Sequence, residues 1–419
     1  MDEDSRTFVI VGAGQAGRWL ALTLRADGFK GRIVWFGDEP HAPYERPPLS
    51  KAVLKGDVGL AQLALIAPDK LAELDTDFRP GQRIVAIDRA AQVVVAENGE
   101  RTAYDLLFLA HGGSARMLPG VPAHPRVLSL RSFDDALALK ARLGDAKRVL
   151  VLGGGWIGLE VAASARLLGR EVVVLEAAPR LCIRTVPECV SAQLLELHQA
   201  RGVEVRLGDG VSGVTASDTG VSVQLASGER VDGDVLVVGI GLIAHDAIAA
   251  QAGITCANGV LTDAHGRSDD PKVFAVGDVA NALRADGQRA RIESWENAQR
   301  QAVAAAKAAL GIAHDPEAEG PPWFWSDQYD DNLQLLGVPT ASMQIVERHV
   351  PGKRQRLYFF CEGERVRALA AINAGREVKI VRKWLLQNRF PALAALTDSA
   401  TDLNKLPLAA APSTQEQRA

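Results

Sequence analysis

The chain has 419 residues, of which 47% are hydrophobic and 23% are charged, and its formal net charge is −4. This length predicts about two to three domains, and the slightly acidic balance argues against a general nucleic-acid-binding protein. The N-terminal residues MDEDSR are unlike a secretory signal or a transit peptide. No apolar run reaches about 18 residues, the length that a transmembrane helix needs. We therefore expect a cytoplasmic globular protein that does not span a membrane.

Cysteine usage gives no sign of a metal centre or a disulfide framework. The four cysteines form no CxxC or CxxxxC pattern and have no histidine-rich neighbourhood, so we expect reduced thiols and no structural zinc or iron–sulfur site. They are Cys182, Cys189, Cys256 and Cys361.

The first predicted element group covers residues 7–38. A strand at 8–11 leads into a GxGxxG turn, a helix follows to Arg25, and a second strand at 32–36 is followed by Asp38 and Glu39. This order is typical of a dinucleotide-binding unit, in which the helix N-terminus and the glycine turn receive a pyrophosphate and the terminal acid binds a ribose. The three glycines are Gly12, Gly14 and Gly17.

The next segments are a proline-rich loop and a group of strands. Residues 43–51, PYERPPLSK, predict a stiff, extended loop, which on physical grounds alone could equally be an ordinary surface loop. Residues 81–97 alternate as a β-meander does. Residues 104–110 predict a buried strand that ends in Ala110-His111-Gly112.

A second dinucleotide-binding unit is predicted at 149–176, VLVLGGGWIGLEVAASARLLGREVVVLE. Strand, glycine turn, helix and strand recur, and Glu176 stands where the ribose-binding acid belongs. Its carboxylate would repel a 2′-phosphate, which favours NADH over NADPH, although Arg180 and Arg184 nearby weaken that preference. The glycines are Gly153, Gly155 and Gly158. Two such units predict two bound dinucleotides, or one dinucleotide and one decayed copy; both copies keep the glycines and the acid, which favours two working sites.

The remaining chain predicts a β-rich segment at 203–238, a strand at 272–278 ending in Asp278, and an Ala-rich helix at 292–310. Gly320-Pro321-Pro322 is the clearest linker. Strands at 357–360 and 366–372 and an amphipathic helix at 376–388 follow it, and the polar tail after about Pro412 is expected to be disordered.

Two GxGxxG units, an interrupting domain and a late strand-Gly-Asp resemble the two-dinucleotide flavoprotein family. The pieces PYERPPLSK, GGGWIGLE, VFAVGD, ESWENAQRQA and PWFWSDQ narrow the resemblance to NADH-dependent ferredoxin reductases of oxygenase systems, from about Phe8 to Leu403. The resemblance implies an α/β fold with two Rossmann-like domains and an α+β C-terminal domain. The implied domains are 1–115 with 246–320 for FAD, 116–245 for NAD, and 321–419 at the C-terminus.

The resemblance also implies roles for matching residues. Lys51 would lie near flavin N5, paired with Glu160, and these two are the catalytic candidates. The implied FAD contacts are Gly12, Gly14, Ala16, Gly17, Asp38, Arg46, Lys51, Val85, Ala110, Asp278, Trp295 and Trp325. The other implied cofactor contacts, which include the NADH site, are Arg116, Gly153, Gly155, Ile157, Gly158, Glu160, Glu176, Arg184 and Gly241. One residue departs from the family pattern, because His111 replaces the usual threonine and puts the local turn and its flavin contact in doubt.

The chemistry implied is hydride transfer from NADH to FAD, followed by electron transfer to a 2Fe–2S ferredoxin that feeds a monooxygenase or a Rieske-type oxygenase. Residues 39–56 lack the cysteines that disulfide reductases, peroxidases and oxidases of this superfamily use, so electrons must leave the flavin directly. Two alternatives stay open: an NADH-sensing flavoprotein of the apoptosis-inducing-factor type, and a direct NADH:quinone reductase.

Two further hypotheses concern surfaces and gating. Trp156 either gates the nicotinamide pocket or simply packs in the core. An acidic ferredoxin could dock on one of two basic surfaces, although a basic helix face is more often simply solvated. The two candidate surfaces are Arg376, Lys379, Arg382 and Lys383, or Arg284, Arg289 and Arg291.

Overall fold

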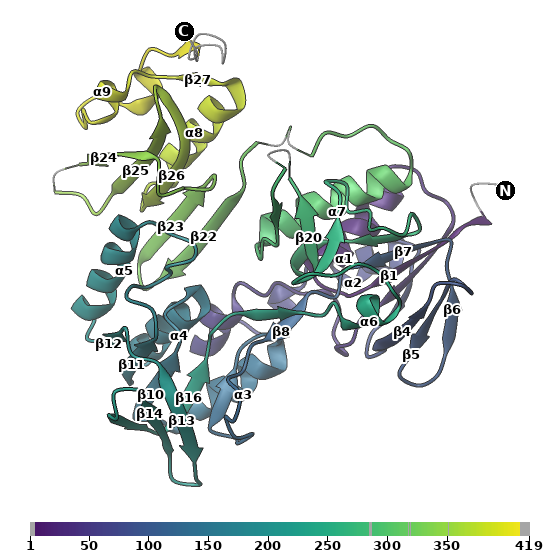
Figure 1. Ribbon diagram of the computed structural model, residues 1–419, viewed down its shortest axis with the longest axis horizontal. Coiled ribbons are helices and arrows are strands. Elements are labelled where there is room, and N and C mark those ends of the chain that lie inside the picture. The colour runs from purple at the N-terminus through teal and green to yellow at the C-terminus, as the bar shows by residue number, and fades with distance from the viewer. Residues whose placement is uncertain (1–4, 285–286, 317, 319, 351, 411–419) are drawn as a thin grey trace. The chain divides into compact units, whose positions relative to one another are not determined.

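The computed structural model describes residues 5–284, 287–316, 318, 320–350 and 352–410 (Figure 1). The tail after Pro412, which was expected to be disordered, lies outside the described residues. Contacts divide the chain into two compact units. Unit 1 comprises Met1–Pro48, Val58–Ala115 and Leu242–Glu317, and unit 2 comprises Leu49–Asp57, Arg116–Gly241 and Ala318–Ala419. The finer three-domain division stays a prediction.

Unit 1 is built on a five-stranded parallel sheet with β1 (Thr7–Val11) at its centre. Side chains of a strand point alternately to the two faces of a sheet, and β1 shows this. Phe8 and Ile10 join the core under helices α1 (Gln15–Ala26) and α7 (Trp295–Ala309), whereas Val9 and Val11 join the core on the other face. Both faces of β1 are therefore covered, which explains its uninterrupted apolar sequence. The other strands, in the order β19-β7-β1-β2-β3, are β19 (Val273–Ala275), β7 (Leu106–Leu109), β2 (Arg32–Phe36) and β3 (Asp77–Arg79).

The second face of this sheet is covered by small antiparallel elements. The predicted meander is present as β4 (Ile84–Asp88), β5 (Val93–Ala96) and β6 (Arg101–Ala103). The remaining elements of unit 1 are η3 (Leu60–Leu63), α2 (Pro68–Glu73), β8 (Gly113–Ala115), β17 (Leu242–Ala244), α6 (Ala247–Gln251), β18 (Val260–Thr262), η4 (Gly277–Val279), β20 (Ala280–Leu283) and β21 (Arg289–Ala290).

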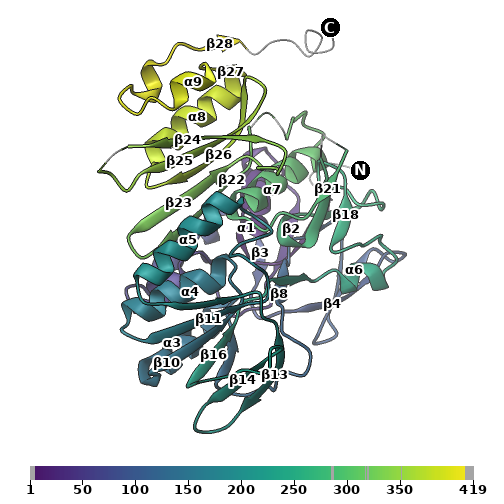
Figure 2. The ribbon, with the colours of Figure 1, turned by 60° about the vertical axis from the view of Figure 1, so that its left-hand side comes forward.

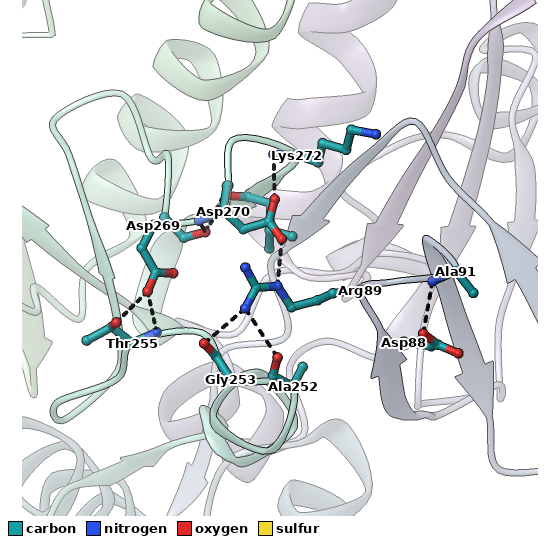
Figure 3. A network of polar contacts seen from close by, with 11 residues as sticks. Asp88, Arg89, Ala91, Ala252, Gly253, Thr255, Asp269, Asp270 and Lys272 are labelled. Carbon is teal, nitrogen blue, oxygen red and sulfur yellow. Dashed lines mark hydrogen bonds and ion pairs between the residues drawn. The ribbon is translucent and has the colours of Figure 1, made fainter.

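Arg89, in the turn between β4 and β5, ties the meander to a segment that returns much later in the chain (Figure 3). Its Nε donates to the Asp270 carboxylate at 2.6 Å, and its Nη1 donates to the carbonyl oxygens of Ala252 and Gly253 at 3.4 and 3.0 Å. One guanidinium thus anchors three points of the returning segment, and this helps to close a unit whose sequence is interrupted.

Unit 2 repeats the parallel sheet, with β10 (Arg148–Leu152) at its centre. Strand β10 lies between β11 and β16, just as β1 lies between β2 and β7. The order is β12-β11-β10-β16-β9, with β12 (Glu204–Leu207), β11 (Glu171–Glu176), β16 (Val235–Val238) and β9 (Val127–Ser129). Helices α3 (Phe133–Asp145), α4 (Trp156–Leu167) and α5 (Glu188–Ala200) and the meander β13 (Val211–Ala216), β14 (Val221–Leu225) and β15 (Arg230–Gly233) complete this part.

The C-terminal part of unit 2 is an antiparallel sheet in the order β22-β23-β26-β25-β24. Helix α8 (Gly375–Gln387) packs on it through Val378, Val381 and Trp384, which lie on one helix face as the amphipathic pattern predicts. Figure 2 shows β22 and β23 next to α4 and α5. The strands are β22 (Trp323–Gln328), β23 (Asp331–Leu336), β24 (Gln344–His349), β25 (Arg356–Glu362) and β26 (Arg365–Ile372), and β27 (Arg389–Phe390), α9 (Leu393–Leu396), η5 (Leu403–Lys405) and β28 (Ala409–Ala410) follow α8.

Two local predictions were wrong. The proline-rich loop is not extended throughout, because Leu49–Val53 forms a π-helical segment, η2, in which Leu49 and Val53 are buried. The strand predicted at 272–278 ends at Ala275, and Asp278 lies instead in the 3₁₀ turn η4. Among the described residues, no helix combines the length and the apolar character that crossing a membrane requires.

Candidate functional site

The glycine turn of unit 1 is closed at two positions and open at one. Gly12 has φ +116, and a Cβ built there would lie 2.4 Å from the carbonyl oxygen of Ala110. A Cβ on Gly17 would lie 1.9 Å from the carbonyl oxygen of Gly12, whereas one on Gly14 would have nothing within 4 Å. The first and third glycines therefore serve the turn and the helix packing, and the second leaves room for a ligand to approach the backbone.

Unit 2 has the same arrangement. Gly153 has φ +108, and its Cβ would lie 2.4 Å from the carbonyl oxygen of Gly239; a Cβ on Gly158 would lie 2.1 Å from that of Gly153. The nearest atom to a Cβ on Gly155 is 3.9 Å away. Helices α1 and α4 both begin after a glycine without a side-chain cap, which leaves their first N–H groups for an anion. Both turns fit a pyrophosphate.

Gln15, directly after Gly14, supports this fit in unit 1. Both polar atoms of its amide are buried, and neither has a hydrogen-bond partner among the described residues. Buried amides are almost always bonded, so a polar ligand at the adjacent turn would satisfy an otherwise costly group. Ala16 follows on α1 and is buried against Gly277, whose built Cβ would lie 3.2 Å from that of Ala16.

Two acidic residues, Asp38 and Glu39, follow β2 and have different environments. Asp38 is exposed, whereas Glu39 accepts hydrogen bonds from Tyr44 Oη at 2.6 Å and from Arg46 Nη2 at 2.7 Å. Burial acts to lower the pKa of Arg46, but the charges of Tyr44, Glu39 and Asp278 together raise it. Unit 1 thus brings together Arg46 and Asp278, two of the predicted FAD contacts.

The other predicted residues of unit 1 lie at element ends or on the surface. Ala110 directly follows β7 and packs over Gly12, and Trp295 begins α7 after the Ser294 cap. Val85 lies on β4 with 39% of its surface exposed.

His111 has a local role that the sequence did not reveal. Its Nε2 donates to the carbonyl oxygen of His245 at 2.7 Å, and its buried Nδ1 has no partner among the described residues. Desolvation lowers the pKa of His111 to about 4, although the bond to His245 acts in the opposite direction. The imidazole therefore holds together two segments of unit 1, and the turn from Ala110 over Gly12 is still formed.

The acid of unit 2 is fixed by backbone donors. Glu176 Oε2 accepts from the Gly154 N–H at 2.6 Å, and its Oε1 accepts from the Ala178 N–H at 2.8 Å. The Arg180 guanidinium, which weakened the NADH preference, is held by the carbonyl oxygens of Val186 and Ile183 and by the Ser191 hydroxyl, at 2.6, 3.1 and 2.7 Å. A carboxylate thus lies beside the glycine turn, while the Arg180 guanidinium is engaged elsewhere.

The other predicted cofactor contacts of unit 2 are Arg184, Gly241, Arg116 and Ile157. A Cβ on Gly241 would lie 3.2 Å from the Arg184 guanidinium, and the Gly241 carbonyl oxygen accepts from the Arg116 N–H at 2.8 Å. Ile157, on the first turn of α4, exposes 44% of its surface, which leaves an apolar side chain available at the helix start.

The ion pair between Lys51 and Glu160 joins η2 to α4. Lys51 Nζ lies 2.8 Å from Glu160 Oε1, and the side chains are 18% and 5% exposed. Ser50 donates to Glu160 Oε2, and Ser164 donates to the Ser50 carbonyl oxygen at 2.6 Å. Because Trp156, Glu160 and Ser164 are spaced by four, they share one face of α4, and η2 is fastened to two of them.

Strand β22 faces the same side of α4. Phe324 contacts Trp156 with ring centroids 4.9 Å apart, and Ser326 Oγ donates to Glu160 Oε1 at 2.7 Å. Trp325 points to the other side of β22 and stacks on Trp323 at 4.9 Å. The contact with Phe324 gives Trp156 a packing role; its gating role stays a hypothesis.

Sequence reasoning missed the hydroxyls that hold Glu160. Ser50 and Ser326 lie within the quoted motifs PYERPPLSK and PWFWSDQ, but only their neighbours Lys51 and Trp325 were selected. The available signal was the alternation along β22, where Ser326 and Gln328 are polar residues at the positions expected to face the core.

One predicted basic surface is wrong in part. The Arg291 side chain is only 8% exposed and pairs with Glu293 at 2.6 Å, so it cannot serve an exposed docking face. On α8, Arg376, Lys379 and Lys383 are exposed, and Arg376 pairs with Asp402 at 2.7 Å.

The four cysteines are free thiols, and no cluster of metal-binding side chains occurs in the part of the chain that the structure describes.

Comparisons with known proteins give the chain its family. The family model of pyridine nucleotide-disulphide oxidoreductases matches residues 6–302, and that of the reductase C-terminal domain matches residues 323–407. A 3-phenylpropionate/cinnamic acid dioxygenase ferredoxin–NAD(+) reductase component from Photorhabdus laumondii is 39% identical over 388 residues, which cover 91% of this chain and 96% of that protein.

Solved structures of two ferredoxin reductases are similar to this chain over nearly its whole length. The ferredoxin reductase for the CYP199A2 system from Rhodopseudomonas palustris is 35% identical with a TM-score of 0.90, covering 96% of this chain and 99% of that one. Putidaredoxin reductase, in a covalent complex with putidaredoxin, is 34% identical with a TM-score of 0.90, covering 96% and 97%. These similarities confirm the fold class and the resemblance predicted from the motifs. The chain belongs to the pyridine nucleotide-disulphide oxidoreductase family and carries a reductase C-terminal domain.

Proposed function

We propose that this protein is an FAD-dependent NADH:ferredoxin reductase. It takes electrons from NADH and passes them to a 2Fe–2S ferredoxin, which supplies a monooxygenase or a Rieske-type dioxygenase. The observation that carries the proposal is the content of the loop at residues 39–56, which contains no cysteine and pairs its half-buried Lys51 with the buried Glu160. Disulfide-exchanging members of the superfamily require a thiol in this loop, so a chain without one must pass electrons on without sulfur chemistry.

Unit 1 supplies the proposed FAD site. Its support is the open second glycine, the buried amide of Gln15 and the joint environment of Arg46 and Asp278. In this proposal the turn and the start of α1 bind the pyrophosphate, Asp38 binds the adenosine ribose, Val85 lies at the adenine end, and Asp278 binds the ribityl chain. The turn residues are Gly12, Gly14, Ala16 and Gly17, with Ala110 behind them, and Trp295 lies along the flavin.

Unit 2 supplies the proposed NADH site. Gly155 leaves the turn open, and the first turn of α4 presents free N–H groups and the apolar Ile157. Glu176 is already oriented by two backbone donors, so its carboxylate can accept from a ribose hydroxyl and repel a 2′-phosphate. This arrangement, with Arg180 engaged elsewhere, supports NADH as the coenzyme. Arg116, Gly153, Gly158, Arg184 and Gly241 shape the surroundings.

The chain's own residues then set the electrostatics. FAD, when bound, would supply the conversion between a two-electron donor and a one-electron acceptor. Lys51 would place a fixed positive charge where electron density increases on reduction. Glu160 holds that charge in position through Oε1, and Trp325 would form an aromatic wall. A cytoplasmic location, where NADH is available, fits this role.

Steady-state turnover tests the proposal. The purified protein should contain FAD and should reduce 2Fe–2S ferredoxins with NADH much faster than it reduces quinones or oxygen. Faster reduction of quinones would identify a quinone reductase. A slow reaction with every acceptor, together with a long-lived reduced flavin–NAD complex, would identify an NADH sensor and would contradict the proposal.

A further inference from the structure

Beyond the Lys51–Glu160 pair, unit 2 contains a chain of buried polar side chains that ends on Glu160. Glu160, Ser326, Gln328 and His198 are 4%, 0%, 2% and 0% exposed. They come from three elements that are far apart in the sequence: α4, β22 and the last turn of α5. Buried polar groups are costly unless they are bonded, so four of them in contact need an explanation.

The bonds are continuous. Ser326 Oγ donates to Glu160 Oε1 at 2.7 Å, and Gln328 Nε2 donates to Ser326 Oγ at 3.1 Å. Gln328 Oε1 lies 2.8 Å from His198 Nε2, and His198 Nδ1 lies 3.2 Å from Tyr329 Oη. The path leads from the ion pair to Tyr329, the first residue of the turn between β22 and β23.

The carboxylate fixes the direction of every bond in this path. Glu160 can only accept, so Ser326 must donate to it and must accept from the amide of Gln328. The Gln328 oxygen then faces His198, whose Nε2 must carry the hydrogen. Nδ1 of a neutral imidazole is left to accept from the Tyr329 hydroxyl. All donors therefore point toward Glu160, and a chain of aligned bonds strengthens its last member.

His198 and Tyr329, at the end of the path away from Glu160, have the protonation states that this direction of the hydrogen bonds requires. Burial lowers the pKa of His198, against the opposing effect of the Gln328 bond, which favours the neutral ring that the path needs. Burial also raises the pKa of Tyr329, so its hydroxyl keeps its proton. The Arg201 guanidinium lies over the Tyr329 ring at 4.9 Å and pairs with Asp330 at 3.0 Å, which fixes the turn. Tyr329 holds a left-handed backbone with φ +56, a conformation that a bulky residue rarely adopts without such support.

The geometry points to His198, Gln328 and Ser326 as a positioning relay that sets how strongly Glu160 holds Lys51. Ser326 and Lys51 share the same oxygen, Oε1. A hydrogen bond to that oxygen withdraws electron density that would otherwise neutralise the ammonium. The relay thus leaves Lys51 with more of its positive charge exposed to its surroundings. An amide in the middle of the path makes it a poor proton conductor, so its role is orientation and polarisation. Its effect on a flavin rests on the proposed function; its effect on Lys51 does not.

Competitive acetylation tests the relay directly on the purified protein. Trace acetic anhydride labels each lysine in proportion to its free amine, and mass spectrometry reads Lys51 against Lys55 in the same segment. Ser326→Ala should lower the relative labelling of Lys51 by about fivefold, because the whole of Oε1 becomes available to the ammonium. His198→Phe, which is two hydrogen bonds upstream of Ser326, should lower it in the same direction by a smaller factor. The double variant should go no lower than Ser326→Ala alone.

Conservative variants separate the relay from general loss of packing. Ser326→Thr keeps the hydroxyl and His198→Gln keeps an N–H donor, so both should label like the parent protein. Ser191→Ala removes another buried hydroxyl of unit 2, which bonds to the Leu181 carbonyl oxygen, and should also leave Lys51 unchanged. If Ser326→Ala does not fold, Gln328→Leu breaks the path one hydrogen bond upstream of Ser326, and it should lower the labelling of Lys51 by at least as much as His198→Phe does.

The relay is overturned if Lys51 labelling is unchanged or increased in Ser326→Ala and His198→Phe, or if the two effects add independently. The midpoint potential of bound FAD gives a second readout. In the proposed function, a fivefold change in the reduction equilibrium, about 20 mV for a two-electron couple, should accompany the change in labelling, with a lower potential in Ser326→Ala. Altered labelling with an unaltered potential would support the relay but would contradict the assignment of Lys51 to the flavin.

Discussion

Lys51 and Glu160 lie 109 positions apart in the chain and form an ion pair of 2.8 Å inside unit 2. Lys51 lies in the π-helical segment η2, and Glu160 lies on α4, the helix that follows the glycine turn of unit 2. π-Helical segments are often found at functional sites, and here one brings a cation from the N-terminal part of the sequence to the second dinucleotide-binding unit. The local sequence around Lys51 is therefore folded as part of unit 2.

Removing Lys51 should destabilise unit 2. The Lys51→Met variant leaves a buried carboxylate without its cation, which typically costs about 3–5 kcal/mol. Urea unfolding of the variant and the parent measures this difference. Lys55→Met is the matched control, because Lys55 pairs with Asp57 in a more exposed position and its loss should cost less than about 1 kcal/mol. Equal unfolding free energies for Lys51→Met and the parent would show that the ion pair does not stabilise unit 2.

Alanine should have different effects at Gly155 and Gly158 in the glycine turn of unit 2: one substitution should lower the affinity for NADH, and the other should lower stability. Gly158→Ala would place a Cβ 2.1 Å from the Gly153 carbonyl oxygen, so it should cost about 1–3 kcal/mol or more of stability. Gly155→Ala has room in the folded chain, so its stability should match the parent, but its affinity for NADH should fall on the order of tenfold because the methyl group fills the space left for the pyrophosphate. Thermal unfolding and NADH titration separate the two effects. Unchanged NADH binding in a folded Gly155→Ala protein would exclude this turn as the NADH site.

Glu176 should set the coenzyme preference. Glu176→Gln keeps the size of the side chain and removes the charge that repels a 2′-phosphate, since like charges placed together cost several kcal/mol. The ratio of kcat/KM for NADPH to that for NADH should rise by tenfold or more. Arg180→Gln is the comparison, because that guanidinium is held by Val186, Ile183 and Ser191 and should not take part. A ratio unaffected by Glu176→Gln would place the ribose elsewhere.

His111 should make unit 1 sensitive to acid. Its pKa is about 4 in the folded chain against an ordinary value of 6.5, so between these values the unfolded chain binds a proton that the folded chain does not. Stability is therefore lost as the pH falls from 6.5 toward 4, by up to about 1.4 kcal/mol per pH unit from this group. His111→Thr should reduce that loss, measured by urea unfolding at pH 7 and pH 5.

The exposed His349 provides the control for this experiment. His349→Thr removes an imidazole from the surface and should keep the acid sensitivity of the parent. An equal loss of stability in the parent and in His111→Thr would contradict the buried, neutral state of His111.

The hypothesis that an acidic ferredoxin docks on the basic face of α8 can be tested by charge reversal. Reversing the exposed charges, as in Arg376→Glu with Lys379→Glu and Lys383→Glu, should raise the apparent KM for ferredoxin several-fold and flatten its dependence on salt, because long-range attraction between charges is screened by ions. The same reversal of three exposed charges on unit 1, at Lys30, Lys70 and Lys272, serves as the control. A salt dependence like that of the parent would exclude α8 as the docking face.

Local sequence patterns were enough to predict the order of strand, glycine turn, helix and strand at the centre of both units. Strand β2 begins and ends at the predicted residues, and β1 does so within one residue, because a short apolar run next to a glycine turn leaves little choice of structure. The conformation of residues 49–53 was missed because it depends on Ser50 and Lys51 meeting Glu160, which no local pattern encodes. Ser326, Gln328 and His198 were missed for the same reason: each is ordinary in its own segment, and their connection exists only after α4, α5 and β22 have packed together.

An anaerobic stopped-flow experiment tests the central proposal most directly. The protein is mixed with NADH and then with an oxidised 2Fe–2S ferredoxin, while the flavin and iron–sulfur absorbance bands are followed. We expect NADH to bleach a bound flavin and the ferredoxin to restore the flavin colour as its cluster becomes reduced, without a thiol reagent affecting either step. Protein that carries no flavin and binds none, or a reduced flavin that such ferredoxins leave bleached, would contradict it.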